Sequence, residues 1–170
     1  MKKFELTSEF VTFLGKTLFR IKALVSFGDV AEGELGGFIE RENNLDQSGD
    51  AWVSDDAKVF GNAKVCGNAW VFGDAKVFGN AKVFGNAWVS GDARVQNCRD
   101  YSATSCFGSE NRTTTFFRTK DGGISVRCGC FYGTLREFRE KVKERHGDSR
   151  LAKEYLMLAD LMEFRLSKDE

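Results

Sequence analysis

Alanine and valine alternate with variable residues through the middle of the chain, in a six-residue phrase that occurs eight times. Each copy reads Gly-(Asn/Asp)-Ala-x-Val-y, and only Asp55 replaces the junction glycine. The valines stand at positions 53, 59, 65, 71, 77, 83, 89 and 95, and each alanine stands two residues earlier. Because strand side chains alternate between two faces, these residues share one face and form a narrow core. Gly-Asn and Gly-Asp tolerate the positive φ of corners, so the short period predicts a β-helix.

The residues between alanine and valine keep a second, longer period. Tryptophan stands only at positions 52, 70 and 88, which are 18 residues apart. The other phrases carry basic residues at the same point, one column of Lys58, Lys76 and Arg94 and another of Lys64 and Lys82. Three six-residue sides per turn place such residues directly above one another. The sequence therefore predicts a three-sided prism with an 18-residue triangular coil.

The segment before the repeat alternates and predicts a β-hairpin, with its turn at Gly15-Lys16. The ends of a short prism are open strand edges, and such edges need a cover. We therefore expect residues 1–48 to form an N-terminal hairpin and cap. We expect residues 49–96 to form the β-helix itself.

Residues 97–170 read as a small α+β unit of two strands and two helices. Residues 113–120 and 124–130 flank a Gly-Gly turn and predict a second hairpin. A capping box at Thr134 begins one helix, and Asp148 can cap another. The complete prediction is a mainly β fold, in which a short parallel β-helix lies between an N-terminal β-hairpin cap and a C-terminal ββαα unit.

Two resemblances to known families add to this interpretation. The phrase Val59-Phe60-Gly61-Asn62-Ala63-Lys64 resembles the hexapeptide-repeat family of left-handed β-helices, over residues 49–96. This resemblance implies the left hand. The flanks, GDVAEGELGGFIERENNLDQS and RCGCFYGTLREFREKVKERHGDSRLAKEY, resemble a family of phage and prophage proteins with a short prism between the same two flanks. Its members are often labelled as transferases or polymer-forming proteins, and the family pattern itself implies no activity.

Charge and composition narrow the choice of partners. Lys plus Arg equals Asp plus Glu, at 25 each among 170 residues, so extended nucleic acid is not an expected partner. No apolar run approaches the roughly 18 residues of a membrane span, and the charged N-terminus lacks a signal-peptide core. An odd number of cysteines, five, indicates reduced thiols. We therefore expect a cytoplasmic protein, in the host cytoplasm if a phage encodes it.

The catalytic alternative is a hexapeptide-repeat acyltransferase that uses coenzyme A. The resemblance implies a histidine base on or beside the β-helix. The one histidine, His146, lies far outside the repeat at a predicted helix end, and it is a weak acid or base candidate. Cys128 and Cys130, with Cys98 and Cys106, lack the paired spacing of a zinc site. The sequence thus favours a protein without catalytic residues, metal or cofactor.

Outward-facing aromatic residues form the candidate binding surface, beside the basic columns. Trp52, Trp70, Phe72 and Trp88 lie on the tryptophan side, and Phe60, Phe78 and Phe84 lie on the other sides. Four large aromatic side chains offer up to about 600–1,000 Å². Monomers rarely expose an apolar patch above about 300–600 Å², so this side needs a cover.

Three covers of the tryptophan side are open from the sequence. The first is the chain's own C-terminal unit, because the apolar stripe of its helices needs a partner. The second is another copy, in a homodimer or homotrimer. The third is a host protein or a small nucleotide whose base stacks on the rings. We expect a non-catalytic interaction or scaffold protein that self-associates, and the phage resemblance implies an action against host defence.

Overall fold

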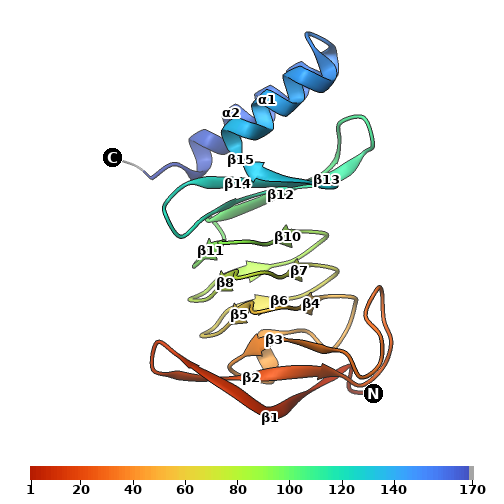
Figure 1. Ribbon diagram of the computed structural model, residues 1–170, viewed down its shortest axis with the longest axis vertical. Coiled ribbons are helices and arrows are strands. Elements are labelled where there is room, and N and C mark those ends of the chain that lie inside the picture. Colours follow the sequence, from red (N-terminus) through yellow and green to blue (C-terminus); the bar gives the residue numbers. More distant parts are fainter. Residues whose placement is uncertain (169–170) are drawn as a thin grey trace.

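The computed structural model describes residues 1–168 and contains a column of stacked coils with a β-sheet at each end (Figure 1). Within these residues, two helices lie beyond the C-terminal sheet, on the side away from the coils. The prediction of a mainly β chain built on a parallel β-helix is confirmed. In the same residues, no helix has the length and apolar character to cross a membrane.

Residues 52–95 form the sides of the coils as eight strands of two residues each. These strands are β4 (Trp52–Val53), β5 (Lys58–Val59), β6 (Lys64–Val65), β7 (Trp70–Val71), β8 (Lys76–Val77), β9 (Lys82–Val83), β10 (Trp88–Val89) and β11 (Arg94–Val95). They pair in parallel as β4-β7-β10, β5-β8-β11 and β6-β9. Trp52 pairs with Trp70, and Trp70 pairs with Trp88. The predicted 18-residue coil is therefore confirmed.

The core of the prism consists of the repeated alanines and valines, all of which are at most 1 % exposed. The junction glycines between residues 49 and 91 have φ between 59° and 70°, which is the left-handed region. At Gly49 a second requirement applies, because a Cβ atom there would lie 2.5 Å from the Gly67 carbonyl oxygen. Glycine thus permits both the corner and the close stacking of successive coils.

The N-terminal strands continue one side of the prism. Strands β1 (Phe4–Phe13) and β2 (Lys16–Ala23) form the predicted hairpin, and β3 (Leu35–Ile39) follows. Strand β2 pairs with β3 antiparallel, and β3 pairs with β5 parallel, so the sheet order is β1-β2-β3-β5-β8-β11. Phe4 and Ile21 are fully buried in the same core as the repeated valines.

On the other two sides of the first coil, side chains donate hydrogen bonds to backbone carbonyls at the strand edges. The buried Lys3 ammonium donates hydrogen bonds to the carbonyls of Gly49, at 3.2 Å, and Ala51, at 2.8 Å. The Asn44 amide, at the end of a 3₁₀ turn (Glu42–Asn44), donates to the carbonyls of Gly61 and Ala63. Unpaired strand edges attract other chains, and here these groups cover them.

Residues 101–134 form a four-stranded antiparallel sheet at the other end of the prism. Its strands are β12 (Tyr101–Phe107), β13 (Arg112–Arg118), β14 (Ile124–Cys128) and β15 (Phe131–Thr134). The sequence predicted β13 and β14 but missed β12 and β15, so the unit is ββββαα rather than ββαα. A register shift after Thr104, with Cys106 at φ 61°, interrupts the alternation of β12. Cys130 lies past the end of β14, because Gly129 turns the chain with φ 58°.

The two predicted helices, α1 (Leu135–His146) and α2 (Arg150–Leu166), pack on one face of this sheet. Phe116 and Val126 of the sheet belong to one buried cluster with the apolar stripes of both helices. The opposite face closes the prism, because Tyr101 and Phe117 belong to the core of the coils. The Tyr101 hydroxyl donates a 2.7 Å hydrogen bond to the carbonyl of Lys82. The sheet therefore separates the helices from the β-helix.

Candidate functional site

The three stacked tryptophans have three different environments. Trp52 is fully buried, with the Phe27 ring against it at 5.4 Å and an interplanar angle of 72°. Trp70 is half-buried and stacks on Trp88, with ring centroids 6.0 Å apart and planes 21° apart. Trp88 is 40 % exposed. The prediction of a fully outward ladder is therefore wrong for Trp52, which the N-terminal loop before β3 buries.

The C-terminal helices are not the cover of the tryptophan side. Their buried residues, Tyr155, Leu158 and Met162 among them, pack on the far face of the four-stranded sheet. The group that does reach the tryptophan side is Arg127 of β14. Of the three covers considered from the sequence, the helix stripe is thus excluded, because its apolar area is already buried within its own unit.

Arg127 lies in a box of aromatic rings at the open end of the tryptophan stack. Its guanidinium carbon is 4.9 Å from the ring centroid of Phe72, 5.7 Å from that of Trp88 and 5.8 Å from that of Tyr132. The Nε atom is buried without a hydrogen-bond partner among residues 1–168. Attraction to ring faces holds this cation where a carboxylate would ordinarily be its partner.

A hollow of about 430 Å³ opens beside this box, and we call it the Trp88 hollow. Its walls are Asn86, Trp88, Asn111, Arg112, Thr113, Arg127 and Gly129. No carboxylate is among these described lining residues. The nearest acidic contact of Arg112 is loose, at 3.9 Å from Glu110. The hollow thus combines a partly exposed indole with two guanidinium groups and several amide or hydroxyl groups.

Contacts from several neighbouring residues hold Trp88 in place. The backbone N–H of Trp88 donates a 3.1 Å hydrogen bond to the Thr115 hydroxyl, which ties β10 to β13. Phe72 and Trp88 pack in a T-shaped arrangement with ring centroids 6.0 Å apart, and Trp70 stacks on Trp88. Thr115 and Arg127 are cross-strand partners, so one antiparallel pair positions both the tryptophan and the cation.

The phenylalanines of the other sides divide into a covered pair and an exposed residue. Phe60 and Phe78 stack at 5.3 Å with planes 7° apart, and Phe13 of the hairpin lies edge-on against Phe60 at 5.6 Å. Phe60 is only 4 % exposed, so its prediction as a surface residue is wrong. Phe84 is 54 % exposed and lies 6.0 Å from the Lys82 ammonium.

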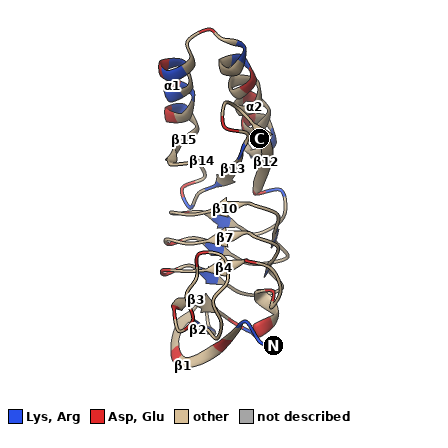
Figure 2. Ribbon diagram, turned by 90° about the vertical axis from the view of Figure 1, so that its right-hand side faces the viewer, with Lys and Arg blue, Asp and Glu red and all other residues tan. Residues whose placement is uncertain are grey.

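The basic columns lie on other sides of the prism than the tryptophans, because Lys58, Lys76 and Arg94 pair within β5-β8-β11. A column of basic strand residues is visible along the coils (Figure 2). Burial, with repulsion from Lys58 and Arg94, lowers the pKa of Lys76. Lys64 lies 3.7 Å from Asp46 and pairs with Lys82 in the third sheet. The cations beside Trp88 are instead Arg112 and Arg127, which no pattern in the sequence singles out.

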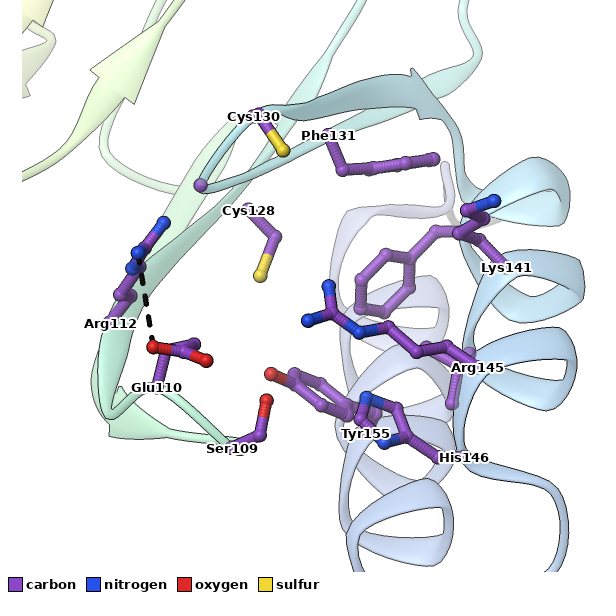
Figure 3. A pocket seen from close by; sticks show the side chains of 13 residues that line it. Ser109, Glu110, Arg112, Cys128, Cys130, Phe131, Lys141, Arg145, His146 and Tyr155 are labelled. Carbon is purple, nitrogen blue, oxygen red and sulfur yellow. Dashed lines mark ion pairs between the residues drawn. The ribbon is translucent and has the colours of Figure 1, made fainter.

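A second, smaller cavity contains the only histidine of the chain (Figure 3). His146 ends α1, and its ring stacks on Tyr155 at 5.7 Å. This cavity lies between the helices and the turns of the C-terminal sheet, away from the coils. The β-helical position that an acyltransferase base requires is therefore not the position of His146. Among residues 1–168, no three His, Cys, Asp or Glu side chains form a group that could hold a metal ion.

These features define the chain as a β-solenoid protein with a small α+β unit at its C-terminal end. A scan against models of known protein families gives no match. No curated protein sequence matches the chain either. The hexapeptide-repeat and phage resemblances stay predictions from the sequence.

Proposed function

We propose that the protein binds a small nucleotide-type ligand without transforming it, at the Trp88 hollow. The observation that carries this proposal is the 40 % exposed Trp88 beside Arg127, a cation held by rings and lacking a carboxylate partner among residues 1–168. A planar base would stack on the indole, and a phosphate would lie between the two arginines.

The expected energies suit this kind of ligand. Stacking of a base on an aromatic side chain is worth about 1–3 kcal/mol. Guanidinium groups bind phosphate oxygens through charge-assisted, often bidentate, hydrogen bonds. Because Trp70, Phe72 and Thr115 already hold Trp88, little ordering free energy is lost on binding.

The size and the charge pattern favour a small ligand over a long polyanion. A hollow of about 430 Å³ lies within the roughly 300–1,000 Å³ of ordinary small-molecule sites. The lysine columns lie on other sides of the prism, so no continuous basic track leads away from Trp88. The equal numbers of basic and acidic residues agree with this choice.

Binding rather than catalysis follows from the groups present. Tryptophan, arginine, asparagine, threonine and glycine line the hollow in the described part of the chain. Histidine, cysteine and carboxylate side chains, the usual general acids and bases, are not among these described lining residues. His146 lies in the separate cavity.

The phage resemblance gives this binding a biological setting. A phage protein that captures a signalling nucleotide would lower its free concentration in the host and so antagonise host defence. Self-association through the tryptophan side is a competing use of the same surface, because a second copy over Trp88 would exclude the ligand.

The test is calorimetric titration of the full chain with adenosine, guanosine, cytidine and uridine monophosphates. We expect at least one to bind, and Trp88→Ala and Arg127→Gln to weaken that binding at least tenfold. Phe84→Ala removes a still more exposed aromatic residue, 54 % against 40 %, from another side and is the control, with unchanged affinity.

Native mass and turnover assays separate the alternatives. A dimer or trimer that becomes a folded monomer in Trp88→Ala, with no nucleotide binding, would replace the ligand proposal by an assembly interface. Consumption of acetyl-coenzyme A with an amine acceptor would instead support the acyltransferase. Nucleotide binding that Trp88→Ala leaves intact would place the ligand elsewhere on the molecule.

A further inference from the structure

The cavity beside His146 has the features of a ligand site of its own (Figure 3). It lies where the β12–β13 turn and the β14–β15 turn face the last two turns of α1. Its volume is about 90 Å³. A single water needs about 10–15 Å³ by this measure, so the cavity has room for a small organic group.

The floor of the cavity is apolar and rigid. Phe131 and Phe138 have ring centroids 5.6 Å apart, and Phe138 meets Tyr155 edge-on at 5.8 Å. Val142 completes this surface from α1. Because these rings also pack in the core between sheet and helices, the floor keeps its shape without a ligand.

Tyr155 supplies a fixed hydroxyl at the edge of this floor. A side chain at Gly108, whose φ is 75°, would overlap that hydroxyl, so the β12–β13 turn packs directly on it. Burial, with the nearby Cys128, raises the pKa of Tyr155. The hydroxyl therefore stays protonated at neutral pH and lines the cavity as a neutral polar group.

The charged groups at the mouth are mostly basic. Lys141 is paired with Glu144 at 2.9 Å, and Arg112 has its loose contact with Glu110. Arg145 has no carboxylate within ion-pair distance in the described part of the chain. Figure 3 shows its guanidinium extending across the mouth toward Cys128 and the Tyr155 hydroxyl.

We infer that this cavity binds a small organic anion, in which a carboxylate or phosphate is carried on an aromatic or other apolar body. The body lies on the Phe138 and Tyr155 rings, and Arg145 is the counter-ion of the anionic group. The site is distinct from the Trp88 hollow, although Arg112 and Gly129 line the wall between the two.

The experiment uses the full chain and two probes, benzoate and phenyl phosphate, with binding followed by calorimetry and by amide shifts of Gly129, Cys130 and Tyr155. We expect at least one probe to bind and to shift these amides. Inorganic phosphate and phenol, each with half of the proposed chemistry, should bind at least tenfold more weakly. The difference between the two probes identifies the preferred anionic group.

Two matched variants on helix α1 test whether Arg145 is the counter-ion of the anionic group. Arg145→Gln should weaken the tighter probe at least tenfold. Arg136→Gln removes another exposed guanidinium of α1, which pairs with Glu140 outside the cavity, and should leave the affinity unchanged. Trp88→Ala should also leave it unchanged, which separates this site from the proposed nucleotide site.

Three outcomes would overturn the inference. One is the failure of both probes to shift the cavity amides at millimolar concentration. Another is equal affinity for phenyl phosphate and inorganic phosphate, which would show that the apolar floor contributes nothing. The third is wild-type affinity in Arg145→Gln.

Discussion

Trp52 and Trp88 hold equivalent positions in the first and third coils, yet Trp52 is fully buried and Trp88 is 40 % exposed. The difference comes from their neighbours. Phe27 lies edge-on against Trp52, and β3 approaches so closely that a Cβ on Gly36 would lie 2.7 Å from the indole. Trp88 has Arg127 beside it and stays partly exposed. One position of the repeat is thus core at one end of the prism and surface at the other.

This contrast predicts unequal costs for the same substitution. Trp52→Ala should lower the free energy of unfolding by about 3–5 kcal/mol, as for other large aromatic residues in a core. Trp88→Ala should cost about 1 kcal/mol, mainly the lost ring contacts. Urea unfolding of both variants measures the difference. Equal losses would contradict the burial of Trp52.

A second pair of variants separates corner geometry from coil stacking. Gly49 and Gly85 both have φ 69°, so alanine introduces the same backbone strain at each, about 1–2 kcal/mol. Only at Gly49 would the new methyl group meet another coil, at 2.5 Å from the Gly67 carbonyl oxygen. Gly49→Ala should therefore destabilise the protein more than Gly85→Ala. A lower midpoint for Gly85→Ala in thermal unfolding would refute this account.

Because of Lys3, we expect the free energy of unfolding to change with pH in the alkaline range. Burial lowers its pKa to about 8, although Asp46 and Asp50 raise it in part. Between pH 8 and about 10.5 the unfolded chain holds a proton that the folded Lys3 has released, so stability rises with pH in this window. Lys3→Met should remove that rise.

The neighbouring lysine is the control for this experiment. Lys2→Met removes an exposed ammonium that pairs with Glu42, and it should keep the rise. Unfolding free energies at pH 8, 9 and 10 suffice to compare the three proteins. An identical slope in Lys3→Met and the wild type would exclude Lys3 as its source.

Tyr101 should have the opposite effect at higher pH. Burial raises its pKa to about 12, above the value near 10 of a free tyrosine. The unfolded chain then releases this proton first, so the stability contributed by Tyr101 is lost between pH 10 and 12. Tyr101→Phe should remove that loss and, at neutral pH, cost about 0.5–1.5 kcal/mol for the hydrogen bond to Lys82.

Tyr132→Phe, at an exposed position, is the matched control for Tyr101→Phe. It should retain the decline in stability above pH 10. If both variants lose the decline equally, burial of Tyr101 is not its cause.

The coils were predictable because two independent patterns agree. Alanine and valine mark the core every six residues, and tryptophan marks one side every 18 residues. Strands β12 and β15 were missed because a bulge at Cys106 and a turn at Gly129 interrupt the local alternation. Both features depend on how the sheet folds over the end of the prism.

The site was predictable only in part, for a related reason. The repeat identifies Trp88 as outward-facing, and the structure agrees. That Phe27 buries Trp52, and that Arg127 reaches Trp88, depends on contacts between segments distant in sequence. A single arginine in a short strand gives no local signal of the rings it will meet.

The 18-residue register also makes the β-helix a spacer whose length can change in whole steps. Removing residues 61–78 would join Phe60 to Gly79, a junction glycine with the same place in the phrase as Gly61. Every remaining column would stay continuous, and the two end sheets would approach by one coil, about 4.8 Å. Insertions of 18 residues would move them apart by the same step. The separation of the two ends can therefore vary through duplication or loss of coils while the residues that form each end stay unchanged.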